Sequence, residues 1–216
     1  MAHPYWPLFD LEVRTPMLTL RPVTDEVATG LAALAAEGVH DPGFAPFSVP
    51  WTDLPPGEME RGVLQFHWRS RAETSPRSWR VPFGAFVDGE LVGSTDLAAT
   101  DFPVLRQFET GSWLGRRFQG RGLGTEMRLA TLSVGFLALD AVRATTGAWH
   151  DNGPSLGVTR SLGYEEEGRR RAKRRDRADE IVGFRMSRDH FLATLRRDDI
   201  EIVGAAPVRE LLGIAR

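Results

Sequence analysis

The chain has no cysteine among its 216 residues. It therefore has no disulfide bond, no thiolate nucleophile to carry an acyl group, and no zinc or iron–sulfur site built on thiolates. Apolar runs are short as well: no stretch approaches the roughly 18 residues of a membrane-spanning helix, and the N-terminus lacks the pattern of a signal peptide. We therefore expect a cytoplasmic protein with no membrane partner, and a reducing compartment is compatible with this composition.

An excess of one charge sign is also lacking. The formal net charge is −2, and the hydrophobic and charged shares of 42% and 26% are ordinary for a soluble globular protein. No whole-protein field attracts the chain to nucleic acid or to an anionic membrane. The length predicts one large domain, which we expect over residues 1–197, with a C-terminal strand-and-turn extension over residues 198–216 packed on the same domain.

The first half of the chain shows clear signals for strands and helices. Alternating apolar and polar residues over Met17–Val23 predict a strand, and Thr24 is placed to cap a helix that ends at Gly38. Glu58–Ala72 has the pattern of a second helix. Asp88–Gly89 is the dipeptide that most favours a two-residue hairpin turn, so strands are expected on both sides of it.

The second half alternates strands and helices. We expect a strand at Phe108–Gly115, a long helix from Leu123 to near Asp140, a strand at Ala141–His150, a short helix at Asn152–Gly163 and a charged hairpin at Tyr164–Ser187. The order predicts a mixed α/β (α+β) domain around a largely antiparallel central sheet. The strands on either side of the long helix should be parallel and joined by a right-handed crossover.

The stretch "RRFQGRGLGTEM" places Gly120, Gly122 and Gly124 between a predicted strand and the long helix. One interpretation is a tight turn without a ligand. The other is a cradle of backbone amides for a diphosphate at the helix N-terminus, because glycine lets a ligand approach the backbone closely. The motif is neither a Walker loop nor a dinucleotide-binding fingerprint. Three arginines are close enough in sequence to assist such a site: Arg116, Arg117 and Arg121.

These residues resemble a known family. Gln119-x-x-Gly122-x-Gly124 is similar to the Gln/Arg-x-x-Gly-x-Gly/Ala signature of the GNAT superfamily of acyl-coenzyme A N-acyltransferases. About 28 residues later, "DNGPSLGVTRSLGY" resembles the family's Asn-x-x-Ser…Leu-Gly-Phe/Tyr segment. The early "LTLRPVT" is similar to the branch that contains the ribosomal-protein N-acetyltransferases, the Rim type. The resemblance covers about Leu18 to Ser187.

The resemblance implies a GNAT-type fold, with a splayed pair of parallel strands and flanking helices. It also implies an acyl-coenzyme A co-substrate, acetyl-CoA or succinyl-CoA, and we expect no metal. The pantetheine arm would follow the Trp113 strand, the diphosphate would rest on the glycine loop, and Asn152 and Ser155 would approach a pantetheine amide and the thioester sulfur. The implied donor-binding residues are Trp113, Leu114, Gly115, Gln119, Gly120, Arg121, Gly122, Leu123, Gly124, Thr125, Asn152 and Ser155.

Transfer to an amine requires an acid, a base and stabilisation of an oxyanion. The tyrosine that many family members use as the acid corresponds to Thr159, so the resemblance points to Ser155 instead. Helix capping is the competing interpretation of Asn152 and Ser155. Glu109 and His150 are the candidate bases, and a proton relay through water is an alternative. A backbone N–H on the splayed strand, near Trp113 or Leu114, would face the oxyanion.

The proline-rich loop His40–Gly57 holds three large aromatic residues, Phe44, Phe47 and Trp51. We expect this loop and Asp101–Gln107 to line the binding site of the acceptor amine. Packing of the aromatic residues in the core is an equally good explanation. A succinyl donor would require a cation for its second carboxylate, and Arg106 or a hairpin arginine is available for this role. Neither the acceptor nor the acyl group follows from the sequence.

The segment Gly168–Arg177 contains seven basic residues and one acid, which raises the alternative of a ribosome- or RNA-binding module. The acids around it reduce the net charge of Glu165–Glu180 to +1, so a solvated rim or a subunit contact is favoured and nucleic acid is not expected as a partner. A third hypothesis is an acyl-CoA sensor without turnover. The main hypothesis is an N-acyltransferase that acts on a small-molecule amine or a protein N-terminus by direct attack in a ternary complex, as a homodimer or higher homo-oligomer.

Overall fold

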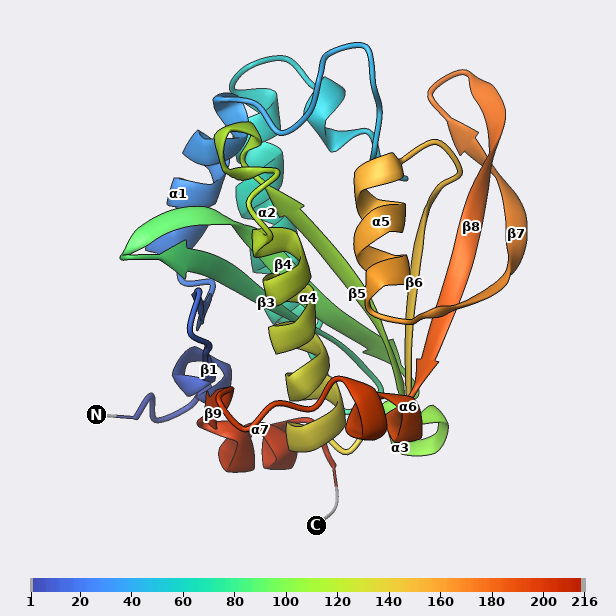
Figure 1. The fold of residues 1–216 in the computed structure, drawn as a ribbon. Helices are drawn as coiled ribbons and strands as arrows, with labels where there is room; N and C mark the ends of the chain where they lie inside the picture. The colour runs from blue at the N-terminus through green and yellow to red at the C-terminus, as the bar shows by residue number, and fades with distance from the viewer. Residues whose placement is uncertain (1, 215–216) are drawn as a thin grey trace.

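A single mixed sheet runs through the molecule. The computed structural model describes residues 2–214, and within them the sheet has nine strands in the order β7-β8-β6-β5-β4-β3-β2-β1-β9. Neighbouring strands are antiparallel except β5 and β6, the one parallel pair in the described chain (Figure 1). The strands are β1 (Glu12–Arg14), β2 (Thr19–Pro22), β3 (Ser78–Val87), β4 (Glu90–Thr100), β5 (Gln107–Leu114), β6 (Arg143–Trp149), β7 (Glu165–Arg174), β8 (Arg177–Ser187) and β9 (Glu201–Val203).

Helices cover both faces of this sheet. Helices α1 and α2 pack on one face, and α4 and α5 lie on the other (Figure 1). The helices are α1 (Asp25–Ala36), α2 (Glu58–Ala72), α3 (Phe102–Leu105), α4 (Leu123–Ser133), α5 (Gly153–Ser161), α6 (Arg188–Thr194) and α7 (Ala205–Leu211). The predicted mixed fold with one parallel pair in a largely antiparallel sheet is confirmed. No helix in residues 2–214 has the length and apolarity needed to cross a membrane.

Local sequence signals set several of these boundaries as expected. The Thr24 hydroxyl accepts a hydrogen bond from the Val27 amide at 3.3 Å and caps α1. Asp88 and Gly89 have φ angles of 49° and 84°, the left-handed pair that a tight hairpin between β3 and β4 requires. Helix α2 spans the predicted residues, but Phe66, which its pattern turns inward, is 42% exposed.

The long helix behind the glycine loop does not end as a regular helix. After α4 the chain continues as a π-turn over Val134–Ala138, two residues short of the predicted end near Asp140. Gly135 lies against the Phe108 ring of β5, and a Cβ atom there would stand 2.2 Å from the ring. The close approach fixes the C-terminal end of this helix on the sheet, and with it the orientation of the loop at its N-terminus.

The C-terminal segment joins the same sheet. Strand β9 pairs with β1, with Ile202 opposite Val13, and the side chains of Val208 and Leu212 are fully buried in the main core. The expected strand is present, but the expectation of only a turn after it is wrong, because α7 follows. The last two residues of the segment, 215 and 216, lie outside the described chain.

Candidate active site

The two parallel central strands pair over three residues and then part. Their last pair is Glu109 with Thr145, and beyond it β5 and β6 share no backbone pairing. One step further, the Thr146 hydroxyl donates to the Thr110 carbonyl at 3.1 Å, where a backbone amide would stand in a continuous ladder. The remaining half of β5 therefore has an edge that β6 does not cover, as the resemblance implied.

The glycine loop stands at the open end of this strand gap. Gly120 and Gly122 have φ angles of 74° and 79°, and Gly122 is the N-cap of α4. The backbone N–H groups from Gly120 to Gly124 donate to no acceptor in the described chain. An uncapped helix N-terminus carries a partial positive charge, so these consecutive donors form a site for an anion.

Two backbone amides among the implied donor-binding residues, those of Gln119 and Thr125, are already bonded within the protein. The Gln119 amide donates to the Arg116 carbonyl at 3.3 Å, and the Thr125 amide donates to the Gly122 carbonyl at 3.1 Å. The Gln119 side chain donates to the carbonyls of Val39 and Leu114, at 2.7 Å and 3.0 Å. In this structure Gln119 therefore ties the loop to its surroundings, and the donors that remain are those of Gly120 to Gly124.

The three arginines near the loop are not equivalent. Arg116 pairs with Asp41 at 3.2 Å, and Arg117 pairs with Glu37 and Glu90. Arg121 is exposed and makes no ion pair with any residue that the structure describes. Of the three, Arg121 is the one whose charge is available to a ligand phosphate.

Asn152 and Ser155 lie at the start of α5, the helix that follows β6. The Asn152 Oδ1 accepts a hydrogen bond from the Ser155 amide at 3.2 Å, so Asn152 caps the helix. Ser155 is half-buried, and its hydroxyl has no hydrogen-bond partner in the described chain. Thr159, at the place of the usual tyrosine, is buried. Capping occupies one atom of Asn152 and leaves the Ser155 hydroxyl available.

Glu109 lines a cavity of about 530 Å³ on the α2 face of the sheet. Phe66, Arg69, Arg80 and Thr145 are among its other lining residues. The predicted base thus lies beside a space large enough for a small amine, at the last pair of the parallel strands. The aromatic residues of the loop His40–Gly57 do not line this cavity, whereas Gln107 does.

Sequence reasoning missed a second carboxylate on the same face. Asp96 of β4 lies opposite Gly111 of β5, and its Oδ1 accepts from Arg80 at 2.7 Å. Burial raises the pKa of Asp96 above its usual value, and the Arg80 guanidinium partly opposes this shift. An isolated acid within a strand has no motif around it, so only the fold shows that Asp96 stands near the strand gap.

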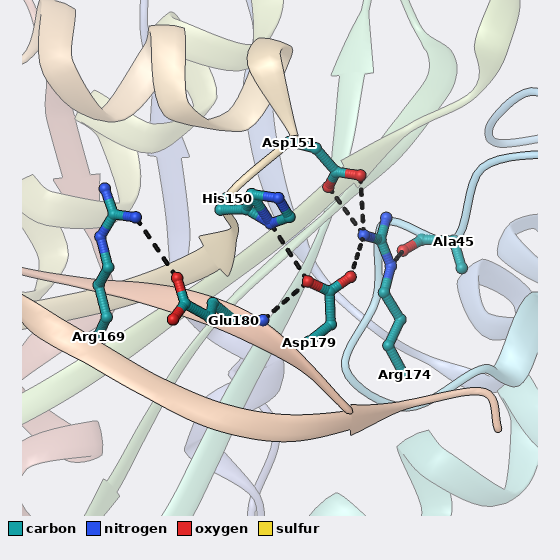
Figure 2. A network of polar contacts seen from close by, with 7 residues as sticks. All are labelled: Ala45, His150, Asp151, Arg169, Arg174, Asp179 and Glu180. Carbon is teal, nitrogen blue, oxygen red and sulfur yellow. Dashed lines mark hydrogen bonds and ion pairs between the residues drawn. The ribbon is translucent and has the colours of Figure 1, made fainter. Parts of the chain in front are cut away.

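His150, the other candidate base, belongs to a network of polar contacts (Figure 2). The network connects the β7–β8 hairpin to the proline-rich loop His40–Gly57, called the aromatic loop below. Its Nδ1 lies 3.3 Å from Asp179. The buried Arg174 donates to Asp151 at 2.8 Å, to Asp179 at 3.0 Å and to the Ala45 carbonyl at 2.9 Å. The Glu180 amide and Arg174 lower the pKa of Asp179, which keeps it ionised as a partner for Arg174.

The aromatic loop packs against the protein itself. Phe47 and Trp51 lie 5.1 Å apart between ring centroids, and Trp51 lies 5.7 Å from Trp113 of β5. Phe44 lies under the Arg174 guanidinium. Arg106, a predicted substrate residue, donates to the Asp140 carbonyl at 2.7 Å, near the start of β5. In this structure all four predicted acceptor-side residues are engaged with neighbouring protein groups.

A buried cation was also missed. Arg128 of α4 is only 4% exposed, and it reaches the strand gap from the α4 face. Every residue from Glu126 to Ser133 is buried, so this helix has no exposed face. The sequence pattern therefore cannot distinguish a buried charged residue from one on a solvent-exposed face. Tyr164, expected as core packing, is buried with its hydroxyl unpartnered.

Comparisons with known proteins agree with the fold. Residues 17–165 match the family model described as "Acetyltransferase (GNAT) domain". YdaF of Bacillus subtilis (strain 168), described as a candidate ribosomal N-acetyltransferase, is 32% identical over 91 residues, which are 42% of this chain and 49% of YdaF. The match therefore spans about half the length of that relative.

Two solved structures show the same fold. RimJ of Mycobacterium smegmatis, in complex with CoA-disulfide, superposes with a TM-score of 0.66 at 21% identity, covering 88% of this chain and 96% of RimJ. The spermidine/spermine N-acetyltransferase SpeG of Vibrio cholerae gives a TM-score of 0.64 at 14% identity, covering 82% and 97%. At these identities the likeness concerns the fold alone.

Proposed function

Because the chain belongs to the acetyltransferase (GNAT) domain family, we propose that it is an N-acyltransferase that moves an acetyl or succinyl group from acyl-coenzyme A to a primary amine. The observation that carries the proposal is the run of unbonded amides from Gly120 to Gly124 beside the gap between β5 and β6. A diphosphate suits a helix N-terminus of this kind. Arg121 adds a positive charge at the same loop.

The residues around the gap fit the rest of the donor. The edge of β5 that β6 does not cover offers backbone groups around Leu114 to a pantetheine arm as an added strand would. The Gly115 amide is already bonded to the Val92 carbonyl at 2.9 Å, and the Leu114 carbonyl to the Gln119 side chain. The Nδ2 of Asn152 is left over from capping and is available to a pantetheine carbonyl. When bound, coenzyme A supplies the acyl group as an activated thioester.

Glu109 is the proposed base, because it lies at the junction of the cavity and the strand gap. It takes one proton from the acceptor ammonium, and the neutral amine then attacks the thioester carbon. The C–N bond forms and the C–S bond breaks. Ser155 passes its proton to the departing sulfur and regains one from the attacking nitrogen, so the one proton released overall is the proton that Glu109 took and returns to water. A backbone N–H near Trp113 or Leu114 stabilises the oxyanion. Without cysteine, direct attack in a ternary complex is the natural order.

Two classes of amine acceptor remain, a small molecule and a protein N-terminus. The cavity beside Glu109 suits a small amine, and a protein N-terminus is the alternative, in line with the name of YdaF. An α-amino group has a pKa of about 8 and a lysine amine about 10.4, so the first needs less help from a base. A panel of polyamines, amino acids and peptides with free N-termini separates these classes by initial rate.

The first test follows the release of free thiol from acetyl-CoA and succinyl-CoA in the presence of amines. Gly122→Trp should abolish donor binding, because a side chain there fills the cradle. Gly57→Trp is the matched control. Gly57 is also a helix N-cap, with φ 83° and open space where a Cβ would be added, but it belongs to α2 and not to the glycine loop. Saturable donor binding that survives in Gly122→Trp would refute the cradle.

The second test separates the acid from the base. Ser155→Ala should lower kcat by about 10²-fold with little change in donor Kd. Glu109→Gln should lower kcat by a similar factor. An unchanged rate in Ser155→Ala excludes the serine as acid, and an unchanged rate in Glu109→Gln excludes the glutamate as base, in which case Asp96→Asn is the next variant.

Two rival functions make different predictions. A sensor binds acyl-CoA without turnover, so turnover of any amine excludes it. An RNA-binding module binds RNA without coenzyme A and loses this binding in salt. Support for the module is weak, because Arg174 and Arg175 of the basic hairpin are already paired with acids. The proposed homodimer or higher homo-oligomer is checked by light scattering of the purified chain.

A further inference from the structure

The side chain of Arg128 bridges the two strands just beyond the point where they part. Its Nη1 donates to the Thr146 hydroxyl of β6 at 3.2 Å, and its Nη2 donates to the Ser112 hydroxyl of β5 at 3.3 Å. Since Glu109 and Thr145 form the last backbone pair, the guanidinium occupies the first open section of the gap. It is reached from α4, the helix that begins at the glycine loop.

No carboxylate in the described chain contacts this buried charge, and the nearest influence is the buried Asp96, whose pKa the Arg128 charge lowers without forming an ion pair. Arg128 forms no ion pair, and its Nε has no hydrogen-bond partner. The other buried arginine behaves differently: Arg174, at 5% exposure, is paired with both Asp151 and Asp179. A buried cation without a counter-charge is costly, and proteins normally pair it. Because Arg174 has two ion pairs and Arg128 has none, we infer that the anionic partner of Arg128 is part of a bound ligand.

Tyr164 stands in the same place with a second unused donor. Its hydroxyl is buried and forms no hydrogen bond of standard geometry, although the side chains of Arg128 and Thr110 lie within its reach. Burial raises the pKa of Tyr164, and the nearby Arg128 charge and Thr110 partly offset this, so the phenol stays protonated as a donor at neutral pH. Arg128, Tyr164 and the two hydroxyls of Ser112 and Thr146 thus form a small polar site inside an otherwise apolar core.

The position of this site restricts which anion fills it. The phosphates have their own donors in the exposed loop, Gly120 to Gly124, whereas Arg128 faces the buried strand gap. A reaction oxyanion exists only during the transfer step, whereas a carboxylate on the acyl group is present for the whole time that the donor is bound. The remaining part of the donor that enters the gap is the acyl group, and a carboxylate at its end is planar and matches the fork of a guanidinium.

Resting on the proposed function, we propose that Arg128 and Tyr164 bind the terminal carboxylate of a short dicarboxylic acyl group. The donor is then a coenzyme A monothioester of a dicarboxylic acid, with acetyl-CoA a poorer ligand. Among the cations considered for a second carboxylate, Arg106 and the buried hairpin arginine Arg174 are already engaged with protein oxygens, and the hairpin arginines without an ion pair in the described chain, such as Arg170, are exposed at the surface. Arg128 is buried, uncompensated and inside the gap, so it fills the role that they leave open.

The experiment compares two stable thioether analogues of coenzyme A by calorimetry, S-(3-carboxypropyl)-CoA and S-butyl-CoA. Both carry a four-carbon chain, and only the first ends in a carboxylate. The wild-type chain should bind the carboxylate analogue about ten- to a hundredfold more tightly, the range expected for hydrogen bonds to a charged group. Neither analogue reacts, so the result does not depend on finding the acceptor amine.

Variants then assign the preference to the site. Arg128→Met should bring the ratio of the two dissociation constants to about one, Arg128→Lys should keep part of it, and Tyr164→Phe should reduce it several-fold. The matched control is Arg160→Met, since Arg160 is exposed on α5 and makes no ion pair within residues 2–214. It should leave the ratio unchanged.

Two results overturn the inference. One is equal binding of the two analogues by the wild type, which needs no variant and holds even if Arg128→Met fails to fold. The other is a preference that persists in folded Arg128→Met. Failure of the proposed function looks different, because coenzyme A and both analogues would then not bind at all.

Discussion

Asn152 has two polar side-chain atoms, and the fold uses one of them. Its Oδ1 caps α5, while its Nδ2 donates to no residue in the described chain. The two roles proposed for this residue, cap and donor contact, therefore belong to different atoms. A substitution that keeps one atom type and removes the other separates them.

Asn152→Asp should keep the cap, because aspartate is as good an N-cap as asparagine, and should leave the melting temperature within about 2 °C. It should weaken coenzyme A binding by roughly tenfold, since the donor to pantetheine is lost. Asn152→Ala should lose both and cost about 1 kcal/mol of stability. Calorimetry and thermal unfolding provide the two readouts. Unaltered affinity in Asn152→Asp would leave Asn152 a cap alone.

His67 gives a prediction about pH. It is 3% exposed on α2, and burial, followed by the Arg71 charge, lowers its pKa to about 4. The unfolded chain binds this proton near pH 6.5, so the folded state loses stability as pH falls from about 6.5 to 4, by up to about 3 kcal/mol. His67→Gln should flatten this part of the profile in urea unfolding at pH 7, 5.5 and 4.5. If the free energy of unfolding fell equally with pH in the wild type and in His67→Gln, His67 would not be the cause.

At the scale of elements, the network in Figure 2 joins three segments that are far apart in sequence. Arg174 links the end of β7 to Asp151 before α5 and to Ala45 in the aromatic loop. Arg175 of the same hairpin pairs with Asp53 of that loop at 2.7 Å. The basic hairpin therefore holds the irregular loop in place, a role that neither the nucleic-acid nor the subunit-contact hypothesis assigned to it.

Arg174→Met should lower the melting temperature by roughly 5 °C or more, because it removes the partner of Asp151 and the Ala45 carbonyl and one of the partners of Asp179. It should also speed proteolytic cleavage within residues 40–57. Arg170→Met is the control: Arg170 is exposed on the same strand and makes no ion pair in the described residues. Equal cleavage rates in the two variants would show that the loop does not depend on this contact.

Most elements carried their own local signals. The Thr24 cap, the Asp88–Gly89 turn and the parallel pair around α4 follow from short-range chemistry, and the structure confirms them. Strand β1 and helix α7 were missed, because β1 has three residues and α7 seven, too few to show a period. The glycine loop was found from its motif, whereas Arg128 and Asp96 are single residues that only the packing of distant strands places at the gap.

For the whole molecule, the C-terminal segment is part of the core. Deleting residues 198–216 removes β9 and the fully buried Val208 and Leu212, at about 2 kcal/mol or more each. We expect the melting temperature to fall by roughly 10 °C or more. The control is Val203→Thr, at a β9 position that is 39% exposed, which should change stability little. A truncated chain as stable as the full one would make the segment a dispensable appendage.

Trp113 has a consequence for experiment. It lies on the strand proposed to hold the donor, and Trp51 rests against it at 5.7 Å. Indole emission shifts with the polarity around the ring, and a ligand arriving on this strand alters that polarity. The protein thus carries an intrinsic optical reporter, so titration in a fluorimeter should follow ligand arrival without dye, label or turnover, and Trp51→Phe should show how much of the signal comes from the neighbouring ring.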